Sequence, residues 1–127
     1  MHDDTEVRLA VPAAPEFLRL ARLTVAGVAS RMGFTYDEVE DLRIAIDELC
    51  FALVGTNGRE GSIELRYSLQ AEDLVVEGFG AFADPVPVAP TLSPLSRQIL
   101  SAVVDEHDVA IGERGPTFRL RKRRHTT

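Results

Sequence analysis

Glu48 is the residue of this chain best suited to chemistry, because it stands in a helical segment that is otherwise rich in apolar residues. A carboxylate within hydrogen-bond reach of a hydroxyl group or a water molecule can act as a general base. The alternative is an ordinary carboxylate on the solvent-facing side of a helix. The choice between the two depends on what else the chain places beside Glu48.

The helix that carries Glu48 is marked by its first residues and by its core face. Thr35 and Glu38 form a capping box, in which each side chain satisfies a free backbone N–H at the helix start. One face carries apolar residues at intervals of three and four, namely Val39, Leu42, Ile46, Leu49 and Leu53. A second stripe contains Asp41, Ala45, Glu48 and Ala52. We therefore expect a helix over 35–54 in which Glu48 lies on this second stripe.

The remaining elements must position this helix. In chain order we expect a strand over 5–10, a helix over 16–32, the helix over 35–54, strands over 62–69 and 73–77, an irregular loop over 78–94, a helix over 95–104, and a hairpin of 108–111 with 117–122. On the buried side of the helix over 16–32 we expect Phe17, Leu20, Leu23 or Thr24, and Val28. This order predicts an α+β fold, a two-layer sandwich whose mixed, mostly antiparallel sheet is covered on one face by three helices.

Composition indicates a single domain over 1–127, since 45% hydrophobic residues are enough for one core without disulfides. The only cysteine, Cys50, lies within the helix pattern and is expected to be a small buried hydrophobe. No CxxC or HxxxH spacing occurs, so we expect no metal site built from these residue types. The start of the chain has no signal-peptide pattern, and no apolar run approaches the ~20 residues that cross a bilayer. We expect a cytoplasmic protein without a membrane partner.

The net charge is −6, yet the C-terminal end is basic. Its cationic residues are Arg119, Arg121, Lys122, Arg123 and Arg124. One interpretation is a nucleic-acid contact, but the domain is acidic and Phe118 is the only aromatic residue nearby. The interpretation that we favour places Arg119 and Arg121 on the solvated face of a final strand, followed by a frayed basic tail over 122–127. Direct binding of nucleic acid is therefore not expected.

Three segments in this order and spacing resemble one protein family. They are DLRIAIDELC, VVEGFGAFADP, and SAVVDEHDV with the later GPTFRLRKR. The chain resembles small bacterial anti-sigma factors that are also serine kinases, members of the GHKL or Bergerat-fold ATPase superfamily, from its first strand to Arg124. The resemblance implies the histidine-kinase-like ATPase fold.

The resemblance gives Glu48 the place of a general base in the central helix. Four residues later the family has a magnesium-ligating Asn, and this chain has Ala52. A methyl group offers no oxygen to a cation that requires oxygen ligands. We therefore slightly favour the view that Glu48 is a solvent-facing carboxylate and not a base.

The second family motif, D-x-G-x-G, binds adenine through its Asp. Without a gap the Asp falls on Gly78 and the glycines on Gly80 and Phe82, whereas a shifted register puts Val76 at the Asp position. Neither register supplies a carboxylate, and Glu77 points to the opposite face of the strand. Gly78 and Gly80 are thus expected to be vestigial positions of a nucleotide pocket.

The third family motif is a G-x-G that holds phosphates with backbone N–H groups. Its glycines correspond here to Pro94 and Ser96, and proline has no N–H to donate. Arg97 is the only basic residue between Arg66 and Arg114, and it could supply one phosphate contact. We therefore expect no cofactor, with Arg97 and Ala52 as further vestigial pocket positions.

The leading hypothesis is an anti-sigma factor that sequesters an RNA polymerase sigma factor, is released by an anti-anti-sigma protein of the STAS type, and has lost ATP binding and kinase activity. The resemblance implies a homodimer and a sigma-factor contact through the first helix, which implicates Arg19 and Arg22. For either arginine taken alone, an ordinary solvated face is the better interpretation.

The alternative is an active, Mg-ATP-dependent protein-serine kinase that phosphorylates its anti-anti-sigma partner. Glu48 would be its base, and Asp47 or Asp84 would have to replace the missing magnesium ligand. Asp47 points about 100° away from Glu48 around the helix, so it is poorly placed for this role. A third possibility is a regulatory domain that binds a different partner.

Overall fold

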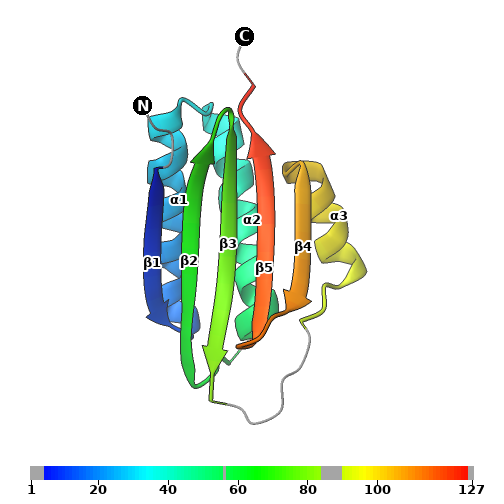
Figure 1. The fold of residues 1–127 in the computed structure, drawn as a ribbon. Helices are drawn as coiled ribbons and strands as arrows, with labels where there is room; N and C mark the ends of the chain where they lie inside the picture. The colour runs from blue at the N-terminus through cyan, green and yellow to red at the C-terminus, as the bar shows by residue number, and fades with distance from the viewer. Residues whose placement is uncertain (1–4, 56, 84–89, 126–127) are drawn as a thin grey trace.

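The computed structural model describes residues 5–55, 57–83 and 90–125. The elements, in chain order, are β1 (Glu6–Pro12), a 3-10 turn (Pro15–Phe17), α1 (Leu18–Met32), α2 (Tyr36–Val54), β2 (Gly61–Gln70), β3 (Asp73–Phe82), α3 (Pro94–Val103), β4 (Glu106–Ile111) and β5 (Pro116–Arg123). In Figure 1, α1 and α2 lie behind the sheet, α3 lies beside β4, and the face toward the viewer carries no helix. The predicted two-layer α+β sandwich is confirmed.

The five strands are ordered β1-β2-β3-β5-β4, and all four pairings are antiparallel. The sheet is therefore more regular than the mixed, mostly antiparallel sheet that we expected. Strand alternation sends one set of β2 side chains toward the helices and the other set to the open face. The helix-facing set contains Ile63, Leu65 and Tyr67, and all three are fully buried.

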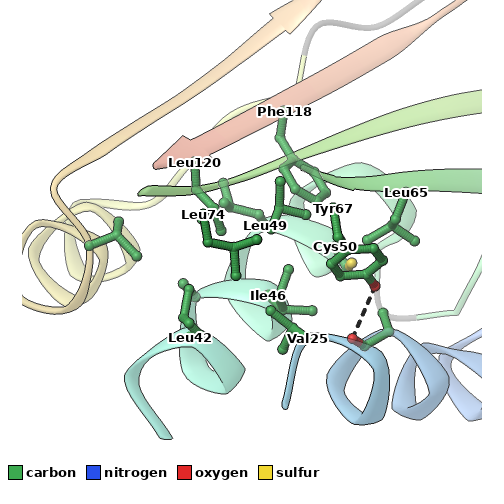
Figure 2. Close-up of a cluster of buried hydrophobic side chains, with 14 of the residues drawn as sticks. Val25, Leu42, Ile46, Leu49, Cys50, Leu65, Tyr67, Leu74, Phe118 and Leu120 are labelled. Atoms are coloured by element: carbon green, nitrogen blue, oxygen red, sulfur yellow. Dashed lines mark hydrogen bonds between the residues drawn. The ribbon is translucent and has the colours of Figure 1, made fainter. Parts of the chain in front are cut away.

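The core lies between the sheet and the first two long helices, and Figure 2 shows its centre. The core face predicted for α2 is confirmed, since Leu42, Ile46 and Leu49 are completely buried. Tyr67 extends across the core from β2, and its hydroxyl donates a 3.1 Å hydrogen bond to the carbonyl oxygen of Ala21 in α1. This bond satisfies a polar group that would otherwise be costly to bury.

The buried face of α1 differs from the predicted one. Ala21, Val25 and Ala29 are fully buried, whereas Leu20 and Leu23 are 39% and 62% exposed. Two alanines on the inner face let the helix lie close to the layer beneath it, so larger side chains are not needed there. The large apolar residues of α1 consequently remain on the outside.

Strand β3 is longer than predicted, because residues 78–82 belong to it and not to a loop. Gly78 and Gly80 are buried on the helix-facing side of the sheet. A Cβ at Gly78 would overlap the ring of Phe118, and a Cβ at Gly80 would lie 2.5 Å from the ring of Phe82. The glycines therefore make room for neighbouring rings within a regular strand.

The basic C-terminal segment is held by the ends of the helices. Lys122 is 7% exposed, and its ammonium group donates a 2.7 Å hydrogen bond to the carbonyl oxygen of Val103 at the end of α3. The Arg124 guanidinium donates to the carbonyl oxygen of Met32 at the end of α1. Cations near helix C-termini also complement the helix dipole. Strand β5 runs to Arg123, so the expectation of a frayed tail from Lys122 onward was wrong, and residues 126–127 lie outside the described residues.

Candidate functional site

Glu48 is partly buried on the side of α2 that faces α3. The hydroxyl group of Ser96, in the first turn of α3, donates a 2.6 Å hydrogen bond to Oε1 of Glu48. Ser96 is itself positioned by the N-cap of α3, because its backbone N–H donates to the Ser93 hydroxyl at 3.0 Å. The carboxylate thus forms a link between two helices.

A cleft of about 330 Å³ lies next to this link. It is lined by Glu48, Phe51, Ala52, Thr91, Leu92, Ser93 and Ser96. The structure therefore brings together two of the predicted pocket positions, Glu48 and Ala52. Arg97 is exposed on α3 and is not part of the lining. Ser96, which donates to Glu48, and Ser93, whose hydroxyl group lies 3.1 Å from that of Ser96, were not singled out as binding groups from the sequence.

Gly78 and Gly80 do not line the cleft either, since aromatic rings of the same chain lie over them. Figure 2 shows Phe118 pointing from β5 into the space between the sheet and α2. The ring of Phe82 is covered in turn by the Arg59 guanidinium, which lies 4.0 Å from the ring centre. Arg59 also donates a 3.3 Å hydrogen bond to the carbonyl oxygen of Leu53, at the end of α2.

Mg-ATP is the cofactor that the resemblance implies, and the residues at these positions do not fit it. Ala52 supplies no oxygen for magnesium. Val76 is fully buried and apolar where an adenine-binding carboxylate would be needed. Pro94, at the first position of α3, has no N–H for a phosphate. Within the described ranges, no group of three His, Cys, Asp or Glu side chains is arranged to hold a metal ion.

Asp47, considered as a substitute magnesium ligand, faces α1. Its carboxylate lies 3.4 Å from the Arg22 guanidinium. Burial raises the pKa of the Asp47 carboxyl above its usual range, although Arg22 opposes this shift. Asp84, the other candidate, lies outside the described residues. Burial also raises the pKa of the Cys50 thiol to about 12, so this side chain stays protonated and inert at neutral pH.

Arg19 and Arg22 lie on the outer part of α1, where Arg19 is exposed and Arg22 forms the ion pair with Asp47. Leu20 and Leu23 accompany them on the exposed surface. The sequence prediction placed Leu20, and either Leu23 or Thr24, on the buried side, and it therefore missed an apolar surface on this helix. The alternation of Ala21, Val25 and Ala29 at four-residue spacing was the signal that could have revealed it.

Among the described residues, no helix is long and apolar enough to cross a membrane.

Residues 11–121 match the family model of the histidine kinase-like ATPase domain. The chain is also similar to curated proteins named serine-protein kinase RsbW. The protein from Bacillus subtilis is 44% identical over 73 residues, which is 55% of this chain and 46% of that protein. The protein from Halalkalibacterium halodurans is 34% identical over 98 residues, covering 75% of this chain and 60% of that protein. The chain thus spans about half the length of the curated relatives that it matches.

A solved structure shares the fold. The crystal structure of the RsbU and RsbW domains of Rv1364c from Mycobacterium tuberculosis matches with a TM-score of 0.72 and 17% sequence identity. The match covers 94% of this chain and 32% of that chain. At this identity the likeness shows the fold alone.

Proposed function

The chain belongs to the histidine kinase-like ATPase domain family, and we propose that it acts as an anti-sigma factor which holds a sigma factor without using ATP. In this proposal a STAS-type anti-anti-sigma protein competes for the same surface and releases the sigma factor. The protein works in the cytoplasm, where RNA polymerase is, and as a homodimer.

The observation that carries the proposal is the apolar outer surface of α1. Leu20 and Leu23 are three residues apart, so their side chains lie on one face of the helix. Arg19 and Arg22 flank them. Exposed apolar groups with charged neighbours are typical of protein-binding surfaces. The small residues beneath already complete the core, so packing of this chain gives no reason for the two leucines.

The geometry of the cleft supports independence from ATP. Glu48 is engaged by Ser96, and the rings of Phe118 and Phe82 occupy the space over the glycines. A nucleotide would have to separate α3 from α2 and displace these rings. Because the same helix face is available without a nucleotide, sigma-factor binding in this proposal is controlled by competition between partners.

The proposal is tested by affinity purification of the tagged full chain from its native cell, followed by identification of the bound chains. We expect a sigma factor to be recovered. Leu23→Asp should lower its recovery at least about 10-fold, since central apolar contacts can contribute 2 kcal/mol or more. Leu95→Asp is the matched control, because Leu95 is 65% exposed but lies on α3. Recovery of neither a sigma factor nor a STAS protein would overturn the proposal.

The second candidate function is an active serine kinase, and it rests on the retention of Glu48 at the position of the base. A kinase must bind Mg-ATP, and a ligand that binds only the folded state raises the melting temperature. We expect no rise with millimolar Mg-ATP and no phosphate transfer to a purified STAS partner. A clear rise together with transfer that Glu48→Gln abolishes would establish the kinase and refute the ATP-independent proposal.

A further inference from the structure

A second, larger hollow lies on the open face of the sheet, on the side away from Glu48. Its volume is about 590 Å³, within the range of small-molecule sites. Residues of β1, β2 and β3, the β4–β5 turn and the start of β5 line it, among them Glu64, Arg66, Phe79, Ala81, Glu113 and Arg114. In Figure 1 this face is turned toward the viewer and no helix covers it.

Arg66 is the most unusual group in this hollow. Its guanidinium carbon lies 4.7 Å from the centre of the Phe79 ring, so the cation is held against an aromatic surface. The nearest carboxylate oxygen belongs to Glu64 at 3.7 Å, which is beyond hydrogen-bond distance. Nε of Arg66 is buried and has no acceptor among the described residues. A charged donor without an acceptor is costly, and a ligand that supplies one would relieve this cost.

Part of the floor of the hollow is apolar. The ring of Phe79 and the methyl group of Ala81 lie two residues apart on β3, and Ala10 lies on β1, with Ser62 and Glu64 of β2 between the two strands. The β4–β5 turn approaches this floor closely, because Gly115 has φ of 149° and a Cβ there would lie 2.7 Å from the carbonyl oxygen of Gly80. A planar apolar group could therefore lie flat beside Arg66.

The charges in the lining restrict the ligand further. Arg66 and Arg114 supply two cations, and Glu64 and Glu113 supply two carboxylates. A polyanion such as a nucleoside triphosphate would be repelled by the two carboxylates. A single carboxylate meets less of this repulsion than a polyanion does, and it can use the planar donor fork of Arg66.

We propose that this hollow binds a small monocarboxylate with a flat apolar or aromatic body. The ligand carboxylate accepts hydrogen bonds from the Arg66 guanidinium, and its body packs on Phe79 and Ala81. The site lies on the opposite face of the sheet from the α2–α3 cleft, and it does not depend on the sigma-factor proposal.

Phenylacetate is a suitable probe, and phenylacetamide is its uncharged control. We expect phenylacetate to shift the backbone amide signals of Ala81, Gly115 and Thr117 and the Nε–Hε signal of Arg66 in ¹⁵N NMR spectra of the full chain. The shifts should saturate with a dissociation constant in the millimolar range, as is usual for so small a ligand. Phenylacetamide should bind at least about 10-fold more weakly, since it lacks the charge.

Substitutions distinguish binding of phenylacetate in the hollow from nonspecific binding elsewhere on the protein. Arg66→Gln should weaken phenylacetate binding about 10-fold or more, and Arg66→Lys should weaken it less, because lysine keeps the charge but not the planar fork. Arg8→Gln is the matched control, since Arg8 is an exposed arginine of the same face that pairs with Glu6 outside the hollow. The proposal is overturned if wild-type shifts do not saturate, if they occur outside the hollow, or if phenylacetamide or Arg66→Gln gives equal binding.

Discussion

The Ser96 hydroxyl donates a 2.6 Å hydrogen bond to the Glu48 carboxylate, which joins α3 to α2 across 48 positions of sequence. In the family that the chain resembles, this carboxylate has the place of a base. Here its oxygen is already the acceptor of an internal bond. We therefore regard Glu48 as a structural link, and we expect its loss to weaken mainly the attachment of α3 to α2.

Ser96→Ala tests this link. The change leaves the partly buried Glu48 without its donor, and we expect a loss of about 1 kcal/mol in the free energy of unfolding. Amide hydrogen exchange in α3 should become faster. Ser101→Ala is the matched control, because Ser101 is an exposed serine on the same helix. Equal urea midpoints for the two variants would show that the bond contributes nothing.

Gly78→Ala tests whether the β3 glycines make room for rings. The added methyl group would overlap the Phe118 ring, and we expect a loss of about 1 to 3 kcal/mol in the free energy of unfolding. Gly27→Ala is the opposite case, since nothing lies within 4 Å of a Cβ there and alanine favours a helix by about 0.5 to 1 kcal/mol. Thermal or urea unfolding measures both. A neutral Gly78→Ala would contradict the assigned packing.

Lys122→Met tests the attachment of the C-terminal strand to the helices. The substitution keeps an apolar stem but removes the hydrogen bond to Val103 and the 3.6 Å ion pair with Asp41. We expect a loss of about 2 kcal/mol in the free energy of unfolding. Arg123→Ala, at an exposed neighbouring position, should change it by less than about 0.5 kcal/mol. Similar effects of the two substitutions would argue that Lys122 is only a surface cation.

Glu38 gives a prediction about pH. Burial raises the pKa of its carboxyl, but hydrogen bonds with the backbone N–H groups and the side chains of Thr35 and His125 lower it. As a result, the pKa lies below its usual value of 4.5. A carboxyl whose folded pKa lies below its unfolded pKa adds stability above the unfolded pKa, and this stability is lost as the pH falls through the folded pKa.

The stability advantage of the wild type over Glu38→Gln should therefore be present at neutral pH and should shrink below pH 4.5. Urea unfolding at neutral pH and at about pH 3 measures the difference. A difference that is constant or grows toward low pH would show that the hydrogen bonds to the carboxylate are not formed in solution.

Local chemistry made part of the fold predictable. The capping box of Thr35 and Glu38 is present with both of its hydrogen bonds, at 2.8 and 3.2 Å. The core face of α2 and the closing hairpin of β4 and β5 also follow the predicted pattern. In each case residues a few positions apart carry the information.

The sequence predictions were wrong where contacts between residues far apart in the sequence determine the secondary structure or the burial of a residue. Gly78 suggests a loop when read alone, and it belongs in a strand because Phe118, 40 positions later, fills the space above it. By hydrophobicity alone Leu20 is a better core candidate than Ala21, yet α1 packs on the sheet layer through the face that carries the small residues Ala21 and Ala29. The Glu48–Ser96 bond could not be predicted for the same reason, since no local pattern pairs the two residues.

The position of β5 in the sheet has a consequence for synthesis. β5 is the last of the five described strands but lies inside the sheet, with β3 on one side and β4 on the other. Among the described residues, β4 pairs with no strand but β5. While the nascent chain emerges from the ribosome, β3 therefore presents an unpaired edge and β4 remains without a neighbour. The five-stranded sheet, and therefore the native fold, cannot form before β5 has been translated.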